Sequence, residues 1–215
     1  MSELSKFEAF KHHTANNAFS MQTYSVGTDL SDCLSLIARF CNREAFQPFR
    51  DIEPVGNLDA CKSLSEIIFS KIPPFQRDND KWSPEMQTGF INNILKGYKA
   101  VPVALYTIDE FKNNCFILDG LQRMTAVSRF FVDRDMEFPL PDGRIITSEE
   151  IFAEGDRHRF WGNTPFDIKV FHFKSHLEAV DFYIEFNENI THSPADILRA
   201  KEYRKSLLEA KLQQK

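Results

Sequence analysis

The sequence Ile117-Leu-Asp-Gly-Leu-Gln-Arg-Met-Thr-Ala126 decides how this chain folds. Its first residues complete an apolar run of the kind that forms a buried strand. Gly120 lets the backbone turn sharply, because glycine adopts left-handed conformations that other residues avoid. Beyond the turn, Met124, Val127 and Phe130 recur at three-residue steps, which predicts a helix with an apolar face. The stretch therefore predicts a strand, a tight turn and a helix in immediate succession.

The turn between this strand and this helix carries groups that suit an anion. A helix N-terminus presents unpaired N–H groups and a partial positive charge. Arg123, in the first helical turn, adds a planar guanidinium that matches two phosphate oxygens. Asp119 is placed either to hold that arginine or to bind a metal ion on the phosphates. The same pattern also occurs in ordinary tight turns, so a phosphate site and a purely structural turn both remain open.

The rest of the chain predicts an α+β fold with a small mixed sheet flanked by helices. Strands are expected at 102–107, 115–118 and 167–173, from their apolar and β-branched composition. Helices are expected from apolar periodicity and from proline and glycine boundaries. The expected helices run from Asp29 through Cys41, from Ser83-Pro84 to Gly97, from the turn through Phe131, over Leu177–Asn187, and from Ser193-Pro194 toward Gln213. The segment Leu64–Phe69 fits either a short helix or a strand.

The chain shows no internal repeat and no low-complexity linker, which favours one domain. Residues 1–25 have weak periodicity and are expected to form an N-terminal arm, with residues 26–215 as a single domain ending in helices. The four cysteines lie in apolar runs without metal-ligand spacing, so we expect small hydrophobic roles and no metal site. No signal peptide and no apolar run near 18 residues is present, which favours a cytoplasmic protein without membrane contact.

Composition limits the kinds of partner that the chain is expected to bind. The formal net charge of −5 argues against non-specific coating of DNA, which requires many cations. Charge is unevenly spread, because residues 133–156 are acidic and the tail after Pro194 is basic. The 21 phenylalanines either stack nucleobases or fill a core. Most of them stand among Ile, Leu and Val, so a phenylalanine-rich core is the favoured interpretation.

Two further motifs accompany the turn in a fixed order. Ile72-Pro-Pro-Phe-Gln-Arg77 is followed by Trp82-Ser83, and near the C-terminal end Phe186-Asn187 and Ser193 precede Ile197-Leu-Arg199. Together with the Asp-Gly-x-Gln-Arg pattern at 119–123, they resemble the N-terminal domain of GmrSD-type restriction enzymes. The resemblance covers roughly residues 60–203. It implies a fold similar to ParB and sulfiredoxin.

The resemblance implies nucleotide binding and, in some members, hydrolysis of nucleoside triphosphates. Carried over by position, the implied nucleotide-binding residues are Gln76, Arg77, Asp119, Gly120, Gln122 and Arg123. Asp119 and Arg123 are the candidates for catalytic roles, with a nucleoside triphosphate and Mg²⁺ as cofactors. Leu121 stands where the family motif has a further glutamine, a departure expected to weaken hydrolysis more than binding. The expected setting is DNA defence, counter-defence or DNA handling in a bacterial or phage-infected cell.

Two other functions compete with this hypothesis. One is a non-catalytic protein that binds DNA or a protein partner, or forms a homodimer, through the basic C-terminal helix. The other is a ParB-like nuclease. The chain has no His-Asn-His module of the kind that the restriction enzymes carry, so we expect no DNA cleavage by this chain alone. Asn187 is either a ligand-binding residue or a helix-ending residue bonded to its own backbone.

Overall fold

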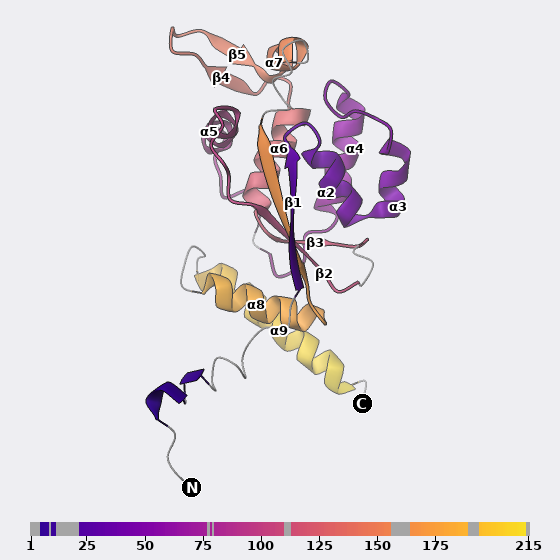
Figure 1. Cartoon of the computed structure of the whole chain (residues 1–215), viewed down its shortest axis with the longest axis vertical. Helices are drawn as coiled ribbons and strands as arrows, with labels where there is room; N and C mark the ends of the chain where they lie inside the picture. The colour runs from indigo at the N-terminus through magenta and orange to yellow at the C-terminus, as the bar shows by residue number, and fades with distance from the viewer. Residues whose placement is uncertain are drawn as a thin grey trace.

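The computed structural model describes residues 5–8, 10–11, 22–76, 78, 80–109, 113–155, 164–188 and 194–213. The described residues form one mixed sheet of four strands and a separate two-stranded hairpin. In spatial order, the strands of the sheet are β1 (Gln22–Asp29), β6 (Pro165–His172), β2 (Val103–Thr107) and β3 (Phe116–Asp119). β6 is antiparallel to β1 and parallel to β2, and β2 is antiparallel to β3. Figure 1 shows the long strands β1 and β6 running through the middle of the molecule.

Helices surround this sheet and supply most of the remaining structure. They are α2 (Cys33–Cys41), α3 (Arg43–Phe46), α4 (Leu58–Phe69), α5 (Pro84–Leu95), α6 (Leu121–Val132), α7 (Ser148–Gly155), α8 (His176–Asn187) and α9 (Pro194–Gln213), with a 3-10 turn at Gln47–Phe49. Side-chain caps start several of them, as where Ser83 Oγ accepts a hydrogen bond from Met86 N at 3.3 Å and Pro84 occupies the first helical position. The hairpin of β4 (Glu137–Pro139) and β5 (Ile145–Thr147) lies beside α7 at one end of the molecule (Figure 1).

The two faces of the sheet bury two different apolar clusters. Side chains alternate between faces along a strand. Leu105 and Ile117 belong to the first cluster, whereas their chain neighbours Tyr106 and Leu118 belong to the second. Both faces of the central strands are therefore buried.

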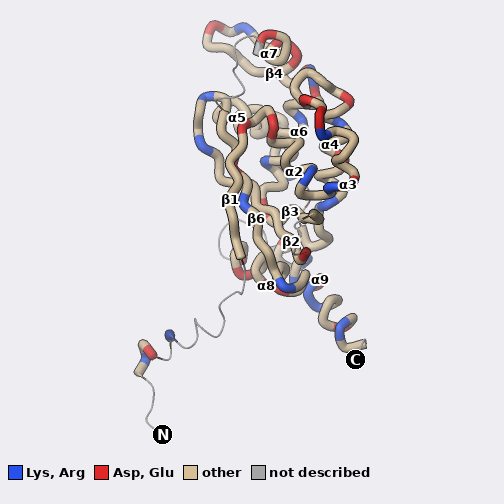
Figure 2. The backbone as a smooth tube through the Cα atoms, turned by 45° about the vertical axis from the view of Figure 1, so that its right-hand side comes forward, with Lys and Arg blue, Asp and Glu red and all other residues tan. Residues whose placement is uncertain are grey.

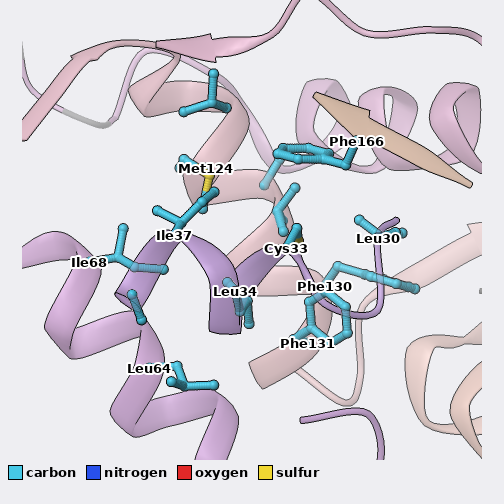
Figure 3. Packing of buried hydrophobic residues seen from close by; sticks show 14 of the residues in the cluster. Leu30, Cys33, Leu34, Ile37, Leu64, Ile68, Met124, Phe130, Phe131 and Phe166 are labelled. Atoms are coloured by element: carbon cyan, nitrogen blue, oxygen red, sulfur yellow. The ribbon is translucent and has the colours of Figure 1, made fainter. Parts of the chain in front are cut away.

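The first cluster is mainly aliphatic and is covered by α2, α4 and α6. Figure 3 shows Leu34 and Ile37 of α2 lying between Ile68 of α4 and the rings of α6. All four cysteines are free and buried, and burial raises the pKa of the Cys61 thiol to about 11. These thiols serve as small core side chains, as the sequence predicts.

The second cluster is mainly aromatic and is covered by α8 and α9. Phe75 is fully buried, with its ring centroid 5.1 Å from that of Tyr183 and 5.9 Å from that of Tyr203. Ala200 of α9 is also fully buried, and Leu207 packs against the same cluster. The part of the C-terminal helix that carries Ala200, Tyr203 and Leu207 therefore packs on its own chain, whereas Leu198 and Leu212 are exposed.

The expected fold class is confirmed: the described residues form a small mixed sheet flanked by helices, with a helical segment at the C-terminal end. The predicted strands at 102–107, 115–118 and 167–173 correspond to β2, β3 and β6. Residues 64–69 lie in the helix α4. Strand β1 was not predicted, and its first residues, Gln22–Ser25, were assigned to the N-terminal arm. None of the helices among the described residues is long and apolar enough to cross a membrane.

Residues 133–155 of the acidic stretch contain the β4–β5 hairpin followed by α7. Figure 2 shows carboxylate-bearing positions along α7, at the end of the molecule away from α9. Its acidic residues make local contacts, as where Asp142 Oδ2 pairs with Arg144 at 2.7 Å and Glu150 accepts the Thr147 N–H at 2.8 Å. The stretch carries its charges on the surface, whereas Met136, Phe138 and Phe152 are buried in the first cluster.

Candidate functional site

The Asp119-Gly120 turn has the geometry that its sequence predicts. Gly120 has φ 95° and ψ 16°, in the left-handed region, and ends β3 immediately before α6 begins at Leu121. A Cβ atom at Gly120 would lie 2.9 Å from Nη2 of Arg123 and 3.2 Å from a methyl carbon of Val103. Two features therefore favour glycine at this position. One is the left-handed backbone conformation, and the other is the space that the guanidinium of Arg123 fills.

The guanidinium of Arg123 lies folded back over this glycine. Its Nη2 donates to Oδ2 of Asp119 at 2.8 Å, and its Nη1 donates to the carbonyl of Val101 at 3.1 Å. The Arg123 side chain is 13% exposed and that of Asp119 is 33% exposed. Of the two roles considered for Asp119, the structure contains the first, in which the carboxylate holds the arginine.

The first turn of α6 has backbone N–H groups that form no hydrogen bond within the helix, which is what an anion site requires. Its first helical hydrogen bond runs from Met124 N to the carbonyl of Gly120 at 2.9 Å. Gly120 occupies the N-cap position and contributes no side-chain cap. The N–H groups of the first helical turn, at Leu121, Gln122 and Arg123, precede that bond and have no partner within the helix. The positive end of the helix dipole thus lies beside the Asp119–Arg123 pair.

The two glutamines of the predicted site tie a loop to the turn. Gln76 is 4% exposed, and its Nε2 donates to the carbonyls of Ile117 at 3.3 Å and Leu118 at 2.5 Å. Gln122 is 2% exposed, and its Nε2 donates to the carbonyl of Asp78 at 2.9 Å. Its Oε1 accepts the N–H of Trp82 at 3.1 Å.

The predicted packing of Gln76 against the turn is therefore found in the structure. Both glutamine side chains hold segment 76–82, of which residues 76, 78 and 80–82 are described, against β3 and α6. Direct contact of either amide with a nucleotide stays a prediction. Arg77, the remaining member of the predicted site, lies outside the described residues.

Arg199 of α9 joins the same network, although the sequence analysis gave it no role in the site. Its Nη1 donates to the carbonyl of Gln76 at 2.9 Å. Its two terminal nitrogens bind the two carboxylate oxygens of Asp78, each at 3.1 Å. Hydrogen bonds from Arg199 hold the pKa of the Asp78 carboxyl below its ordinary value. The three motifs that lie far apart in the sequence thus meet at segment 76–82.

The burial of Leu121 gives a physical reason for the departure from the family motif at this position. Its side chain is 3% exposed and belongs to the first cluster. A glutamine here would place an amide among aliphatic side chains, where an unpaired polar group is costly. At this position the chain has core packing in place of a polar group.

Two polar side chains outside the turn make structural contacts. Asn187 is buried, and its Nδ2 donates to the carbonyl of Tyr183 in the same helix at 2.9 Å, which matches the helix-ending interpretation. His176 Nδ1 lies 3.2 Å from the hydroxyl of Tyr106, beside the second cluster. Across the described part of the chain, no three His, Cys, Asp or Glu side chains are grouped to hold a metal ion.

The basic residues of α9 are largely neutralised within the chain. Arg204 pairs with Asp181 of α8, and Lys201 Nζ lies 2.5 Å from Glu188. Arg199 is paired with Asp78 as described above. Cations that already have carboxylate partners contribute less to binding DNA phosphates, which depends on net neutralisation of charge. DNA remains a predicted partner, but this helix does not present a continuous unpaired basic face.

The fold and the site define a class: a mixed α+β domain in which a strand, a left-handed glycine and a helix present an Asp–Arg pair. Residues 60–215 match the family model described as the N-terminal domain of the GmrSD restriction endonuclease. The match covers well over half of the 215 residues, so the chain belongs to this family. The resemblance noted from the motifs is confirmed, and it associates the chain with restriction and DNA defence. Comparison with curated proteins and with solved structures gave no match.

Proposed function

We propose that the chain is a nucleotide-binding domain that holds the phosphates of a nucleoside triphosphate at the Asp119–Arg123 turn. The observation that carries the proposal is the left-handed Gly120 with the Arg123 guanidinium folded over it, at the uncapped start of α6. Backbone N–H groups, a helix dipole and a guanidinium converge there. Each of these favours a phosphate, and together they form a common type of phosphate site.

The partial burial of Arg123 strengthens this argument. A guanidinium that is only 13% exposed is poorly screened by water, so its attraction for a phosphate oxygen exceeds that of a surface arginine. In the free protein Asp119 balances this charge. On nucleotide binding, phosphate oxygens would share or replace that carboxylate as the partner of Arg123.

Asp119 also supplies what an accompanying Mg²⁺ would need. Mg²⁺ in nucleotide sites is usually held by one or two carboxylates, the phosphates and several waters. Asp119 is a carboxylate beside the turn, and a third of its side-chain surface is exposed. A single carboxylate in this position fits a metal ion that arrives with the nucleotide.

Hydrolysis is a second, separable part of the proposal. Arg123 would neutralise charge that develops on the transferred phosphoryl group, while Asp119 would hold the metal ion that arrives with the phosphates. Leu121, buried in the first cluster, removes one polar group from the motif. We therefore propose tight binding with slow turnover.

The decisive experiment measures binding of ATP, GTP, CTP and UTP, each with Mg²⁺, by calorimetry and by thermal shift. A ligand at a hundred times its dissociation constant stabilises the native state by about 2.7 kcal/mol. We expect one nucleotide to stabilise the wild-type chain, and Arg123→Ala to abolish that effect. Arg129→Ala is the matched control, because Arg129 lies on the same helix and pairs with Asp133 four residues away.

The outcomes separate the competing functions. Equal loss in Arg123→Ala and Arg129→Ala would mean that the arginines act on stability alone and would overturn the site. No response to any nucleotide would overturn nucleotide binding. Nucleotide-independent binding to DNA, steeply weakened by salt, would favour the DNA-binding alternative instead.

A further inference from the structure

A chain of hydrogen bonds links the Asp119–Arg123 turn to the C-terminal helix. Gln76 binds the carbonyl of Leu118, which directly precedes Asp119 in β3. Arg199 binds the carbonyl of Gln76 and the carboxylate of Asp78, across 123 and 121 residues of sequence. Gln122 of α6 then binds the carbonyl of Asp78 from the opposite side.

Several contacts fix the described residues of segment 76–82, and Trp82 is also held from α5 by the bond from Gln87 Nε2 to its carbonyl and by its ring contact with Phe90. The described residues of the segment belong to none of the helices or strands, so no regular backbone ladder fixes it. Gln76 and Gln122 hold it from the sheet and α6, whereas Arg199 holds it from α9. The guanidinium makes three hydrogen bonds, two of them bidentate to the carboxylate of Asp78, which a lysine ammonium does not reproduce.

We infer that Arg199 is a positioning residue for the nucleotide site, acting through Asp78 and Gln76 to fix segment 76–82 beside the start of α6. This inference rests on the proposed function. Arg199 touches no phosphate; it sets the position of the segment that adjoins the phosphate-binding turn. Docking of α9 and binding of nucleotide are then coupled, so each strengthens the other to the same extent.

Lysine and arginine variants at two α9 positions test this inference on the intact chain. Arg199→Lys keeps the positive charge but loses the bidentate guanidinium, and Arg204→Lys makes the same change in the pair with Asp181. We expect Arg199→Lys to weaken nucleotide binding about fivefold, because the loss of one partly exposed set of charged contacts has about that effect. We expect Arg204→Lys to change nucleotide binding less than about twofold. The two variants should have similar unfolding free energies.

Hydrogen exchange adds a readout that needs no nucleotide. The N–H of Trp82 donates to Gln122 at the far end of the segment. We expect its exchange to be faster in Arg199→Lys and unchanged in Arg204→Lys, because only the first contacts segment 76–82. Adding nucleotide to the wild-type chain should slow amide exchange in α9.

The results separate this inference from the proposed function. If wild-type protein binds no nucleotide, the proposed function fails and the inference fails with it. If wild-type protein binds nucleotide and Arg199→Lys binds it equally well, the inference alone is overturned. Equal weakening by Arg199→Lys and Arg204→Lys would also overturn it, since the effect would then come from general loosening of α9.

Discussion

The two faces of the sheet are built in different ways. The first cluster is assembled largely from three helices whose aliphatic side chains recur at helical spacing, as Leu34 and Ile37 do in α2. The second cluster gathers aromatic residues from segments far apart in the chain, including Phe75, Phe173 and Tyr183. One face thus depends on regular helices and the other on long-range contacts of single side chains. We expect the first cluster to contribute most to the stability of the domain and the second to set where the motif segments lie.

The candidate site lies where the chain passes from one cluster to the other. Leu118 belongs to the second cluster and Leu121 to the first, and only Asp119 and Gly120 separate them. The turn is therefore anchored on both sides by buried leucines. This anchoring keeps Asp119 and Arg123 in a fixed relation without a rigid cap on the helix.

The largest effect is expected from Phe130→Ala in the first cluster. Phe130 is fully buried, with ring centroids of Phe138 and Phe152 at 5.7 and 5.0 Å. Truncation of a buried phenylalanine removes apolar contacts and leaves a cavity, at a cost of about 3–5 kcal/mol. Urea denaturation should show a lower midpoint for the whole domain. A loss confined to α8 and α9 would contradict the division of roles between the clusters.

Gly120→Ala at the junction is expected to come second. The alanine would need a left-handed backbone, and its Cβ would meet Nη2 of Arg123 at 2.9 Å. Backbone strain of this kind costs about 1–3 kcal/mol. The guanidinium must also move away from the turn, so nucleotide binding should fall by more than the stability loss explains. Gly143→Ala is the matched control, because Gly143 also has a positive φ but open space for a Cβ.

Phe75→Leu probes the second cluster, with a smaller expected cost of about 1–2 kcal/mol for a shape change in a packed core. Phe173→Leu makes the same change in a fully buried ring of the same cluster that is not next to the motif segment. Both variants should lose similar stability by urea denaturation. Only Phe75→Leu should speed amide exchange at Trp82, since Gln76 follows Phe75 directly. Equal exchange rates in the two variants would show that the cluster does not position the segment.

The local parts of the fold were predictable from sequence. The strand, glycine and helix of residues 117–132 follow one another without a break, so apolar spacing and the need for a left-handed residue suffice. The Ser83-Pro84 helix start is equally local and is found as predicted. The meeting of Gln76 with the turn followed from the order of the family motifs, because no local pattern indicates a contact across about forty residues.

The long-range parts were not predictable in the same way. Strand β1 alternates exposed and half-buried residues, but only Tyr24 and Val26 of the half-buried ones are apolar, so its sequence signal is weak. Its pairing with β6 spans most of the chain. Arg199 stood in a recognised motif, but sequence alone does not reveal that its partner is Asp78. The sequence of α9 does not reveal that Ala200 is buried in the second cluster, while Leu198 and Leu212 of the same helix are exposed. The homodimer contact through α9 stays a prediction.

The smallest expected effect concerns the pH dependence of stability, at a histidine on the edge of the second cluster. His176 lies edge-on to the rings of Tyr106 and Phe116, with centroids at 5.9 and 5.2 Å, and burial lowers its pKa from the ordinary value of 6.5. The unfolded chain therefore takes up this proton first as the pH falls, so the contribution of His176 to stability is present above about pH 6.5 and declines below it.

The change in stability should stay below about 1 kcal/mol, because the ring is partly exposed to solvent. Urea denaturation at about pH 7.5 and about pH 5.5 should show a smaller pH dependence in His176→Gln than in the wild-type chain. An unchanged pH dependence would mean that the folded chain tolerates protonation of His176, and that the stability of the second cluster does not depend on its charge.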